Sequence, residues 1–340
     1  MHETHVVRPP AHAAAYGGPS WPAREASLAD ELGSVWSRCG IDSEYATLRA
    51  VLLHRPGAEL FEVEDADEHL MLETPDAALC GAQHDAMADA YRANGVQVVY
   101  VDPGGSGDAG GSGNDAEDSA APLSPANQMF CADLFVMTPS GAIVGRPAST
   151  VRAGEERWIA RRLADCGVPI LRSVGGTGTF EGADLCWLSP GAAMIGRGLR
   201  TNSEGAAQVA ATLAEIGVET LVVDLPHTSM HLMGEVRFAD HDLAFGRPGR
   251  IPWTALEALR KHGYEVRFFP DDHEMVRGFG HNFVTLGPRR ILMPEGCPIL
   301  QAAYVDAGIE CVTVELGEIH KCAGGIGCLS GVVTRERVAG

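Results

Sequence analysis

The sequence predicts an α/β fold made of five repeated strand–strand–helix–strand units that close into a ring. Five helix-like runs each end at a glycine, and a short β-branched or aromatic run follows each glycine at once. From the second glycine onward the spacings are 50, 46 and 45 residues, and the first is longer by about the length of an inserted segment. Periods this regular indicate that each unit buries its core against its neighbours. The glycines are Gly95, Gly167, Gly217, Gly263 and Gly308.

Each unit can be followed in order along the chain. The run "QVAATLAEIG", residues 208–217, has helical character and ends at a glycine, the residue that most easily adopts the left-handed turn after a helix. The "VETLVV" that follows is typical of a buried strand. Before each of the later four helices lie two more strand-like runs, such as "ADLCWLS" and "GAAMIGR". In a ring of this kind, we expect a ligand to bind where the loops between the units converge.

The ring predicts one domain, residues 26–340, although the length alone would fit two. Residues 1–25, rich in Pro, Ala and His, are predicted to be a flexible tail. Residues 102–125 are rich in Gly, Ser and acidic side chains, a composition that cannot offset the entropy of ordering. We therefore interpret them as a disordered insert within the first unit.

Composition limits the classes of protein to consider. Apolar residues make up 45% and charged residues 21% of 340, which is ordinary for a globular protein. A net charge of −19 argues against nucleic acid and anionic membranes as partners. The chain has no signal-like start and no apolar run long enough for a membrane span. Nine cysteines without paired spacing predict reduced thiols in a cytoplasmic protein with no metal or cofactor. The sequence does not decide whether the protein forms a homo-oligomer.

Polar side chains stand at the start of several units, just before an apolar strand. A thiol, an imidazole and carboxylates at equivalent places could meet at one centre, as nucleophile, general acid/base and cation ligands. Each residue alone also fits a structural role, as a small buried thiol, a core histidine or a turn aspartate. The stretches are "SPANQMFCADLF" with Asn127 and Asp133, "TGTFEGADLCW" with Glu181 and Asp184, "TSMHLMGEVRF" with His231, and "GGIGCLSG" with Cys328.

The motifs "FEGAD", "MHLMG" and "GGIGC" resemble the Glu, His and Cys motifs of the guanidino-modifying enzymes of the pentein fold. That superfamily includes arginine deiminases, dimethylarginine dimethylaminohydrolases, arginine dihydrolases and amidinotransferases. The segment "SEYATLRAVLLHRPGAEL" resembles the opening strand of its deiminase-like members. The resemblance covers residues 43–333 apart from the insert. It implies an α/β-propeller of five ββαβ units around a pseudo-fivefold axis.

The resemblance also implies roles. Cys328 would attack the guanidinium carbon and form an S-alkylthiouronium, while His231 would protonate the leaving amine and then activate water. Asp133 and Glu181 would hold the planar cation with paired N–H···O bonds, with Asp184 as a further carboxylate near the substrate. Glu181 would in addition keep His231 charged.

The substrate's α-carboxylate is expected, by the same resemblance, to bind Asn127, Arg152 and Arg200. Arg152 follows Asp133 by nineteen residues and Arg200 follows Glu181 by the same number, which predicts equivalent strand-to-helix loops. For Arg152, a solvated surface arginine is an equally good interpretation.

Three positions depart from the family pattern. Met233 replaces an Asp that binds guanidinium, Ala132 replaces an Arg, and Gly327 replaces a frequent His or Arg before the cysteine. Met233 leaves room for a substituted nitrogen or for a guanidine other than arginine. Residues 67–80 are interpreted as a lid over the mouth of the ring.

The sequence therefore predicts a hydrolase of arginine or a substituted arginine that gives citrulline plus ammonia or an amine. An amidinotransferase is the alternative, since an acceptor amine could replace water. The sequence leaves two more hypotheses open. The protein could process its substrate further to ornithine, as arginine dihydrolases do, or it could be a non-catalytic binding protein with the pentein fold.

Overall fold

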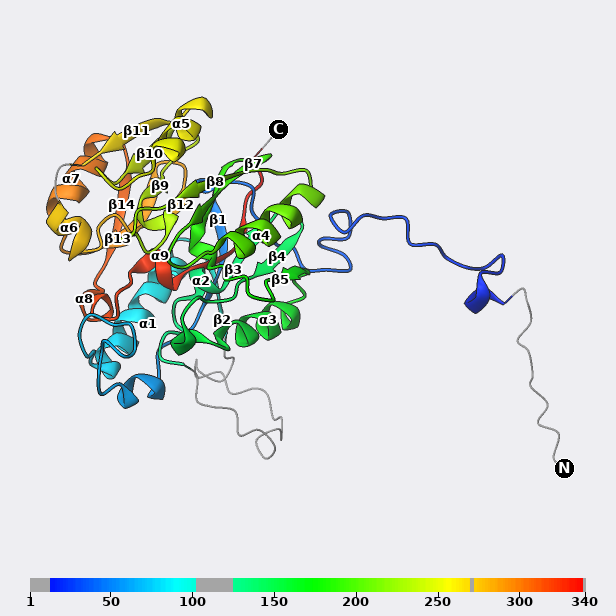
Figure 1. The fold of residues 1–340 in the computed structure, drawn as a ribbon, viewed down its shortest axis with the longest axis horizontal. Helices are drawn as coiled ribbons and strands as arrows, with labels where there is room; N and C mark the ends of the chain where they lie inside the picture. Colours follow the sequence, from blue (N-terminus) through cyan, green and yellow to red (C-terminus); the bar gives the residue numbers. More distant parts are fainter. Residues whose placement is uncertain (1–12, 102–124, 270–271, 339–340) are drawn as a thin grey trace.

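The computed structural model describes residues 13–101, 125–269 and 272–338. Within them, five three-stranded sheets surround a common centre, with their helices toward the outside (Figure 1). Most of the predicted tail and insert, residues 1–12 and 102–124, lies outside the described residues. Residues 13–30, which include the rest of that tail, run away from the body of the molecule (Figure 1).

Each sheet has two antiparallel strands and a third strand parallel to the second, reached through a helix. The second sheet has β3 (Phe135–Thr138), β4 (Gly141–Val144), α3 (Glu155–Asp165) and β5 (Ile170–Ser173). The third has β6 (Leu185–Ser189), β7 (Ala192–Arg197), α4 (Ser203–Glu215) and β8 (Glu219–Asp224). The fourth has β9 (Val236–Phe238), β10 (Leu243–Gly246), α5 (Trp253–Lys261) and β11 (Glu265–Phe268). The fifth has β12 (Val284–Gly287), β13 (Arg290–Pro294), α7 (Pro298–Asp306) and β14 (Glu310–Val314).

The first sheet joins the two ends of the ring. It contains β1 (Leu48–Leu53), α1 (Ala77–Ala93) and β2 (Gln97–Tyr100), and β15 (Gly331–Arg335) from the far end of the chain pairs antiparallel with β1. In this pairing Val51 lies opposite Val332. The strand β15 thus takes the place that the first strand of the unit takes in the other four sheets.

Short helical turns precede or connect these elements. They are α2 (Cys131–Leu134), α6 (Asp272–Val276), α8 (Gly317–His320), α9 (Ile326–Leu329) and the 3-10 helices Ala14–Tyr16, Ala58–Glu62, Thr150–Arg152, Gly182–Asp184 and Leu232–Gly234.

The turns after the helices explain the repeat. All five glycines of the sequence pattern have positive φ, between 71° and 89°. This backbone conformation strains a residue with a Cβ but not glycine, so the predicted left-handed turns are confirmed. Helix starts are also specified locally: Asp76 accepts the N–H of Leu79 at 2.9 Å before α1, and Asn202 accepts that of Gly205 at 2.8 Å before α4.

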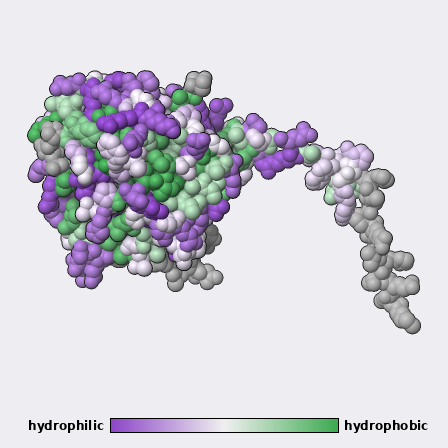
Figure 2. Space-filling view, turned by 45° about the horizontal axis from the view of Figure 1, so that its top comes forward, coloured by the Kyte–Doolittle hydropathy of each residue, from purple (hydrophilic) through white to green (hydrophobic). Residues whose placement is uncertain are grey.

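The first and second strands of the sheets are largely buried, and the third strands are the most exposed. Every residue of β3 and β12 is buried, whereas β8 has one buried residue in six. The fully buried side chains Trp187 and Phe180 pack in the cluster around the second and third sheets. Hydrophilic side chains cover much of the outer surface, with hydrophobic ones between them (Figure 2). No helix within the described ranges is long and apolar enough to cross a membrane.

The α/β-propeller of five ββαβ units is therefore confirmed as the fold. The repeat period indicated this architecture because each period corresponds to one sheet with its helix.

Candidate active site

Each of the five sheets presents one polar residue just before its first strand. Asp133 lies in α2 before β3, and Cys328 lies in α9 before β15. Glu181 and His231 directly precede the 3-10 helices that lead into β6 and β9. Asn282 precedes β12 by two residues. The repeated fold therefore brings five polar side chains from distant segments to the same end of the ring.

A pocket at this end gathers most of the predicted residues. The space between its lining atoms, including the part that is open to solvent, is about 320 Å³. Leu70, Phe130 and Met230 form part of its apolar wall. The predicted residues that line it are Asn127, Asp133, Arg152, Arg200, His231 and Cys328.

One side of the pocket is built on a buried arginine. The Nη1 of Arg152 donates to Asp133 Oδ2 at 2.6 Å, and its Nη2 donates to Glu155 Oε2 at 2.8 Å. The side chain of Arg152 is 3% exposed and its guanidinium lies 5.9 Å from the ring centre of Phe130. Arg152 is thus buried and paired with two carboxylates. It is not the solvated surface arginine that the sequence left as an equally good interpretation.

Glu181 lies behind the pocket and joins three cations. The Nε2 of His231 lies 2.7 Å from Glu181 Oε2, and the Nη1 of Arg200 donates at 3.4 Å. The Nη1 of Arg152 lies 3.5 Å from the same carboxylate. Burial by itself would raise the pKa of Glu181, but these cations, His231 foremost, lower it to about 2. The carboxylate is therefore ionised at any physiological pH.

His231 is held in its charged form by its neighbours. Burial alone would lower its pKa, but Asp133 at 3.8 Å and the hydrogen bond to Glu181 raise it to about 9. The imidazole is therefore protonated at neutral pH and can donate a proton. The sequence-based expectation that Glu181 keeps His231 charged agrees with this geometry.

Asp133 keeps one oxygen free for a ligand. Its Oδ1 is buried and has no hydrogen-bond partner among the residues that the structure describes, while Oδ2 is bound by Arg152. A buried carboxylate oxygen without a donor is costly, on the order of 1–3 kcal/mol or more for a charged group. Because Asp133 lines the pocket together with His231 and Cys328, an N–H donor of a ligand could satisfy this oxygen.

Asn282 holds the candidate nucleophile. Its Nδ2 lies 3.1 Å from Cys328 Sγ, and its Oδ1 accepts the N–H groups of Gly327 at 2.6 Å and Cys328 at 3.3 Å. Burial and the charge of Asp133 raise the pKa of the Cys328 thiol, while the Asn282 contact and Arg237 oppose this shift. Asn282 was missed in the sequence, although "HNF" places it before an apolar strand as in the other four units.

Comparison with known proteins agrees with this architecture. The family model described as arginine deiminase matches residues 122–248. The N(G),N(G)-dimethylarginine dimethylaminohydrolase of Streptomyces coelicolor is 28% identical over 282 residues, which cover 83% of this chain and 96% of the relative.

Two solved structures share the fold. The dimethylarginine dimethylaminohydrolase of Pseudomonas aeruginosa complexed with citrulline has a TM-score of 0.66 at 21% identity and covers 84% of this chain and 99% of its own. An amidinotransferase of the saxitoxin pathway from Microseira wollei has a TM-score of 0.68 at 15% identity, with coverage of 87% and 97%. The chain is therefore similar to the guanidino-modifying enzymes and shares their pentein fold.

Besides Glu181, which lies behind the pocket, two other predicted residues of this pentein lie outside it. Asp184 accepts the hydroxyl of Thr201 at 2.6 Å and the N–H of Leu232 at 2.9 Å, and burial raises its pKa to about 6. It thus supports the turn that follows His231. Met233 lines a separate cavity along the centre of the ring and does not line the pocket that contains Cys328.

The segment interpreted as a lid does border the pocket of this pentein. Leu70 lines it, and Asn127 Nδ2 donates to the carbonyl of His69 at 2.8 Å. The N–H of Leu72 donates to the carbonyl of Lys321 at 2.7 Å. Asn127 therefore contacts the lid segment as well as the pocket.

The prediction that Arg152 and Arg200 occupy equivalent strand-to-helix loops is confirmed, since they lie between β4 and α3 and between β7 and α4.

The charged cluster of this pentein is better suited to an organic cation than to a metal. The ligand atoms of Asp133, Glu181 and His231 lie within 4.8 Å of one another, close enough to be bridged by an ion. However, Arg152 and Arg200 already bring positive charge to the two carboxylates. A planar cation with N–H donors matches the free Asp133 oxygen without displacing these partners.

Proposed function

We propose that this chain is a cysteine-dependent hydrolase of the guanidino group of arginine or a substituted arginine, releasing citrulline and either ammonia or an amine. The observation that carries the proposal is the buried Oδ1 of Asp133, which lies 3.8 Å from His231 Nε2 but accepts no hydrogen bond from the described residues, in a pocket that His231 and Cys328 also line. A guanidinium offers the N–H donors that this oxygen lacks, and its carbon is the electrophile that a thiolate attacks.

The charges around the pocket support a cationic substrate paired with a thiolate. A guanidinium brings positive charge next to Cys328 and Asp133, which line the same pocket. Because a nearby cation lowers the pKa of a thiol, substrate binding favours the nucleophilic form of Cys328.

The proposed reaction has two stages. The Cys328 thiolate forms a C–S bond to the guanidinium carbon, and protonated His231 gives its proton to the departing nitrogen as the C–N bond breaks. This leaves an S-alkylthiouronium on Cys328. Neutral His231 then takes a proton from water, whose oxygen attacks the same carbon, and breakage of the C–S bond releases the ureido product and the thiolate.

Incubation with a panel of guanidines would test the proposal. The purified protein is given arginine, N-methylated arginines and agmatine, with and without an acceptor amine such as glycine. Ureido product together with ammonia or methylamine, formed without acceptor, is the expected result. Ornithine that appears only with acceptor would identify an amidinotransferase instead. No turnover of any guanidine, combined with no labelling of Cys328 by 2-chloroacetamidine, would overturn the proposal.

A cysteine exchange tests the nucleophile itself. We expect Cys328→Ser to lower turnover by a factor on the order of 10⁴ or more, since loss of a covalent nucleophile removes the first stage. Its thermal unfolding should match that of the wild type. Cys311→Ser is the matched control, because Cys311 lies on β14 and does not line the pocket. Activity retained by Cys328→Ser would reject the assignment.

A further inference from the structure

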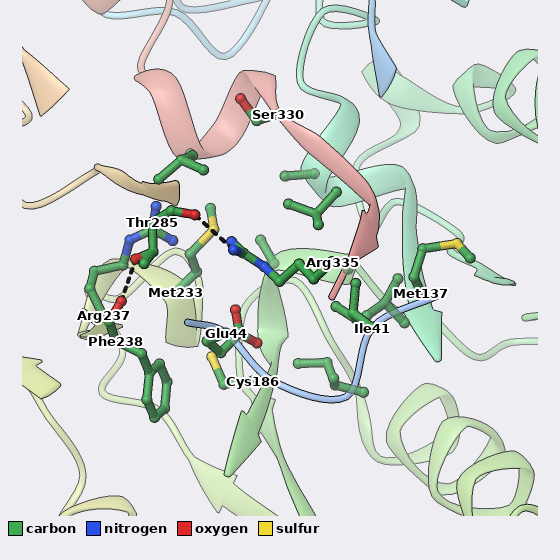
Figure 3. A pocket seen from close by; sticks show the side chains of 18 of the residues that line it. Ile41, Glu44, Met137, Cys186, Met233, Arg237, Phe238, Thr285, Ser330 and Arg335 are labelled. Carbon is green, nitrogen blue, oxygen red and sulfur yellow. Dashed lines mark hydrogen bonds between the residues drawn. The ribbon is translucent and has the colours of Figure 1, made fainter. Parts of the chain in front are cut away.

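A cavity lies along the centre of the ring, directly behind the segment that carries Cys328 (Figure 3). It encloses about 700 Å³ of space and is lined by the first strands of all five sheets. It shares no lining residue with the substrate pocket, but neighbouring residues alternate between the two. Gly327 faces the cavity and Cys328 the pocket, and Ala132 and Asp133 are divided in the same way. The nucleophile segment is therefore the wall between the two spaces.

Arg237, on β9, enters this cavity as a cation without an ion-pair partner. Its guanidinium carbon lies 5.4 Å from the ring centre of Phe283. No carboxylate oxygen of the described residues lies within 4.0 Å of its guanidinium nitrogens. Glu44 and Arg335 border the same cavity, but Glu44 accepts the N–H of Trp187 and Arg335 donates to the carbonyls of Ala46 and Thr285. Burying a cation without a counter-charge lowers the stability of the folded protein, unless another group compensates the charge.

The guanidinium of Arg237 fills the space beside residue 327. A Cβ built on Gly327 would lie 2.3 Å from Arg237 Nη2 and 2.8 Å from Asn282 Oδ1. Residue 327 is a glycine within the short helix α9, so a larger residue there would require the Arg237 guanidinium or the Asn282 amide to move. Arg237 and Asn282 thus enclose the backbone that leads directly to the sulfur.

We infer that Arg237 is a positioning residue for the nucleophile, and that its guanidinium stabilises the Cys328 thiolate from the side opposite the substrate. The inference rests on the proposed function, because that function assigns Cys328 as nucleophile. Arg237 lines only the central cavity and not the substrate pocket, so its charge acts on the nucleophile segment without occupying space needed by the substrate. Asn282 completes the arrangement by directing its amide N–H at Sγ.

The electrostatics of the two groups are consistent with this arrangement. Burial, together with Asp133, raises the pKa of Cys328, and Arg237 acts in the opposite direction. In the same way burial lowers the pKa of Arg237, and the negative charges of a Cys328 thiolate and of Glu44 in the same cavity counteract the shift, with smaller contributions from Cys186 and Tyr304. Each group therefore reduces the cost of burying the charge of the other.

The test measures the thiolate directly and needs no turnover. The rate of Cys328 alkylation by neutral iodoacetamide is followed against pH in the absence of substrate, with the modified peptide identified by mass spectrometry. We expect Arg237→Met and Arg237→Gln to move the midpoint upward by about one pH unit, which slows alkylation at neutral pH about tenfold. Arg237→Lys keeps the charge and should recover part of the shift.

Arg250→Met is the matched control. Arg250 belongs to the same fourth unit but pairs with Glu235 at 3.3 Å and lines neither space. Its loss should leave the midpoint unchanged. Using two neutral replacements for Arg237 keeps a folded variant available if one fails to fold, as judged by circular dichroism. A wild-type midpoint in a folded neutral variant would overturn the inference while leaving the proposed function intact. Failure of 2-chloroacetamidine to label Cys328 in the wild type would overturn both.

Discussion

The two halves of the candidate site are built on different principles. The ionic half, formed by Asp133, Arg152, Glu181, Arg200 and His231, consists of charges that are already paired at distances of 2.6 to 3.8 Å. The sulfur half, formed by Cys328, Asn282 and Arg237, has one amide contact to a thiol whose pKa is raised.

This difference separates binding from reactivity. The ionic half is ready to receive a cation before any substrate arrives, because Glu181 and His231 are charged at neutral pH and Asp133 keeps an oxygen without a hydrogen-bond donor. The sulfur half becomes reactive only when positive charge shifts the thiol toward thiolate. A variant that acts on one half should therefore change a different measurement from a variant that acts on the other.

The largest effect is expected in the ionic half, from Asp133→Asn. An amide cannot hold the guanidinium with the same charge, and it leaves Arg152 with Glu155 and the more distant Glu181. We expect kcat/KM to fall by a factor on the order of 10² to 10³. Asp184→Asn is the matched change of a buried aspartate outside the pocket. It should lower the unfolding free energy, but it should reduce kcat/KM less than Asp133→Asn does. An equal loss of kcat/KM in both variants would place Asp184 in the ionic half, as the sequence suggested.

A pH-dependent stability should also belong to the ionic half. The pKa of His231, about 9 when folded, exceeds its ordinary value near 6.5. The stabilisation from this ion pair is therefore complete below about pH 6.5 and is lost as pH rises through about 9, a change of at most about 3 kcal/mol. Urea unfolding of the wild type and His231→Gln between about pH 6 and 10 measures it. The same decline in both proteins would contradict the prediction.

The smallest effect is expected from Asn282→Ala in the sulfur half. Loss of one amide contact to Sγ, and of the acceptor for two backbone N–H groups, should slow Cys328 alkylation and turnover by a factor on the order of ten. Asn202→Ala removes a different asparagine, the cap of α4, and should reduce stability by about 1 kcal/mol without changing alkylation. If alkylation in Asn282→Ala keeps the wild-type rate, the amide does not control the sulfur.

The repeat could be predicted because it is encoded locally. Each glycine after a helix specifies its own turn, so the five turns and the strands after them were visible in the sequence. The first strand of the first sheet was not visible, because β15 pairs with β1 from the opposite end of the chain. No short-range pattern records a pairing between such distant segments.

The site shows the same limit. The residues before each first strand were correctly expected to converge at one end of the ring, but Asn282 carried no recognised motif and was passed over. For Arg152, the neighbouring Glu155 at i+3 was a local signal of ion pairing that the sequence interpretation did not weigh. Met233 lies in the 3-10 helix Leu232–Gly234, which turns its side chain toward the central cavity. Three-residue turns of this kind cannot be resolved by strand or helix periodicity.

The pairing of β1 with β15 sets the moment at which the ring can close during synthesis. A ribosome makes β1 long before residues 331–335, so this strand has no antiparallel neighbour until they emerge. Cys328 is made only just before that closing strand. A nascent chain shorter than this holds the carboxylates and the histidine of the candidate site but neither the closed ring nor the candidate nucleophile, so it could not carry out the proposed reaction.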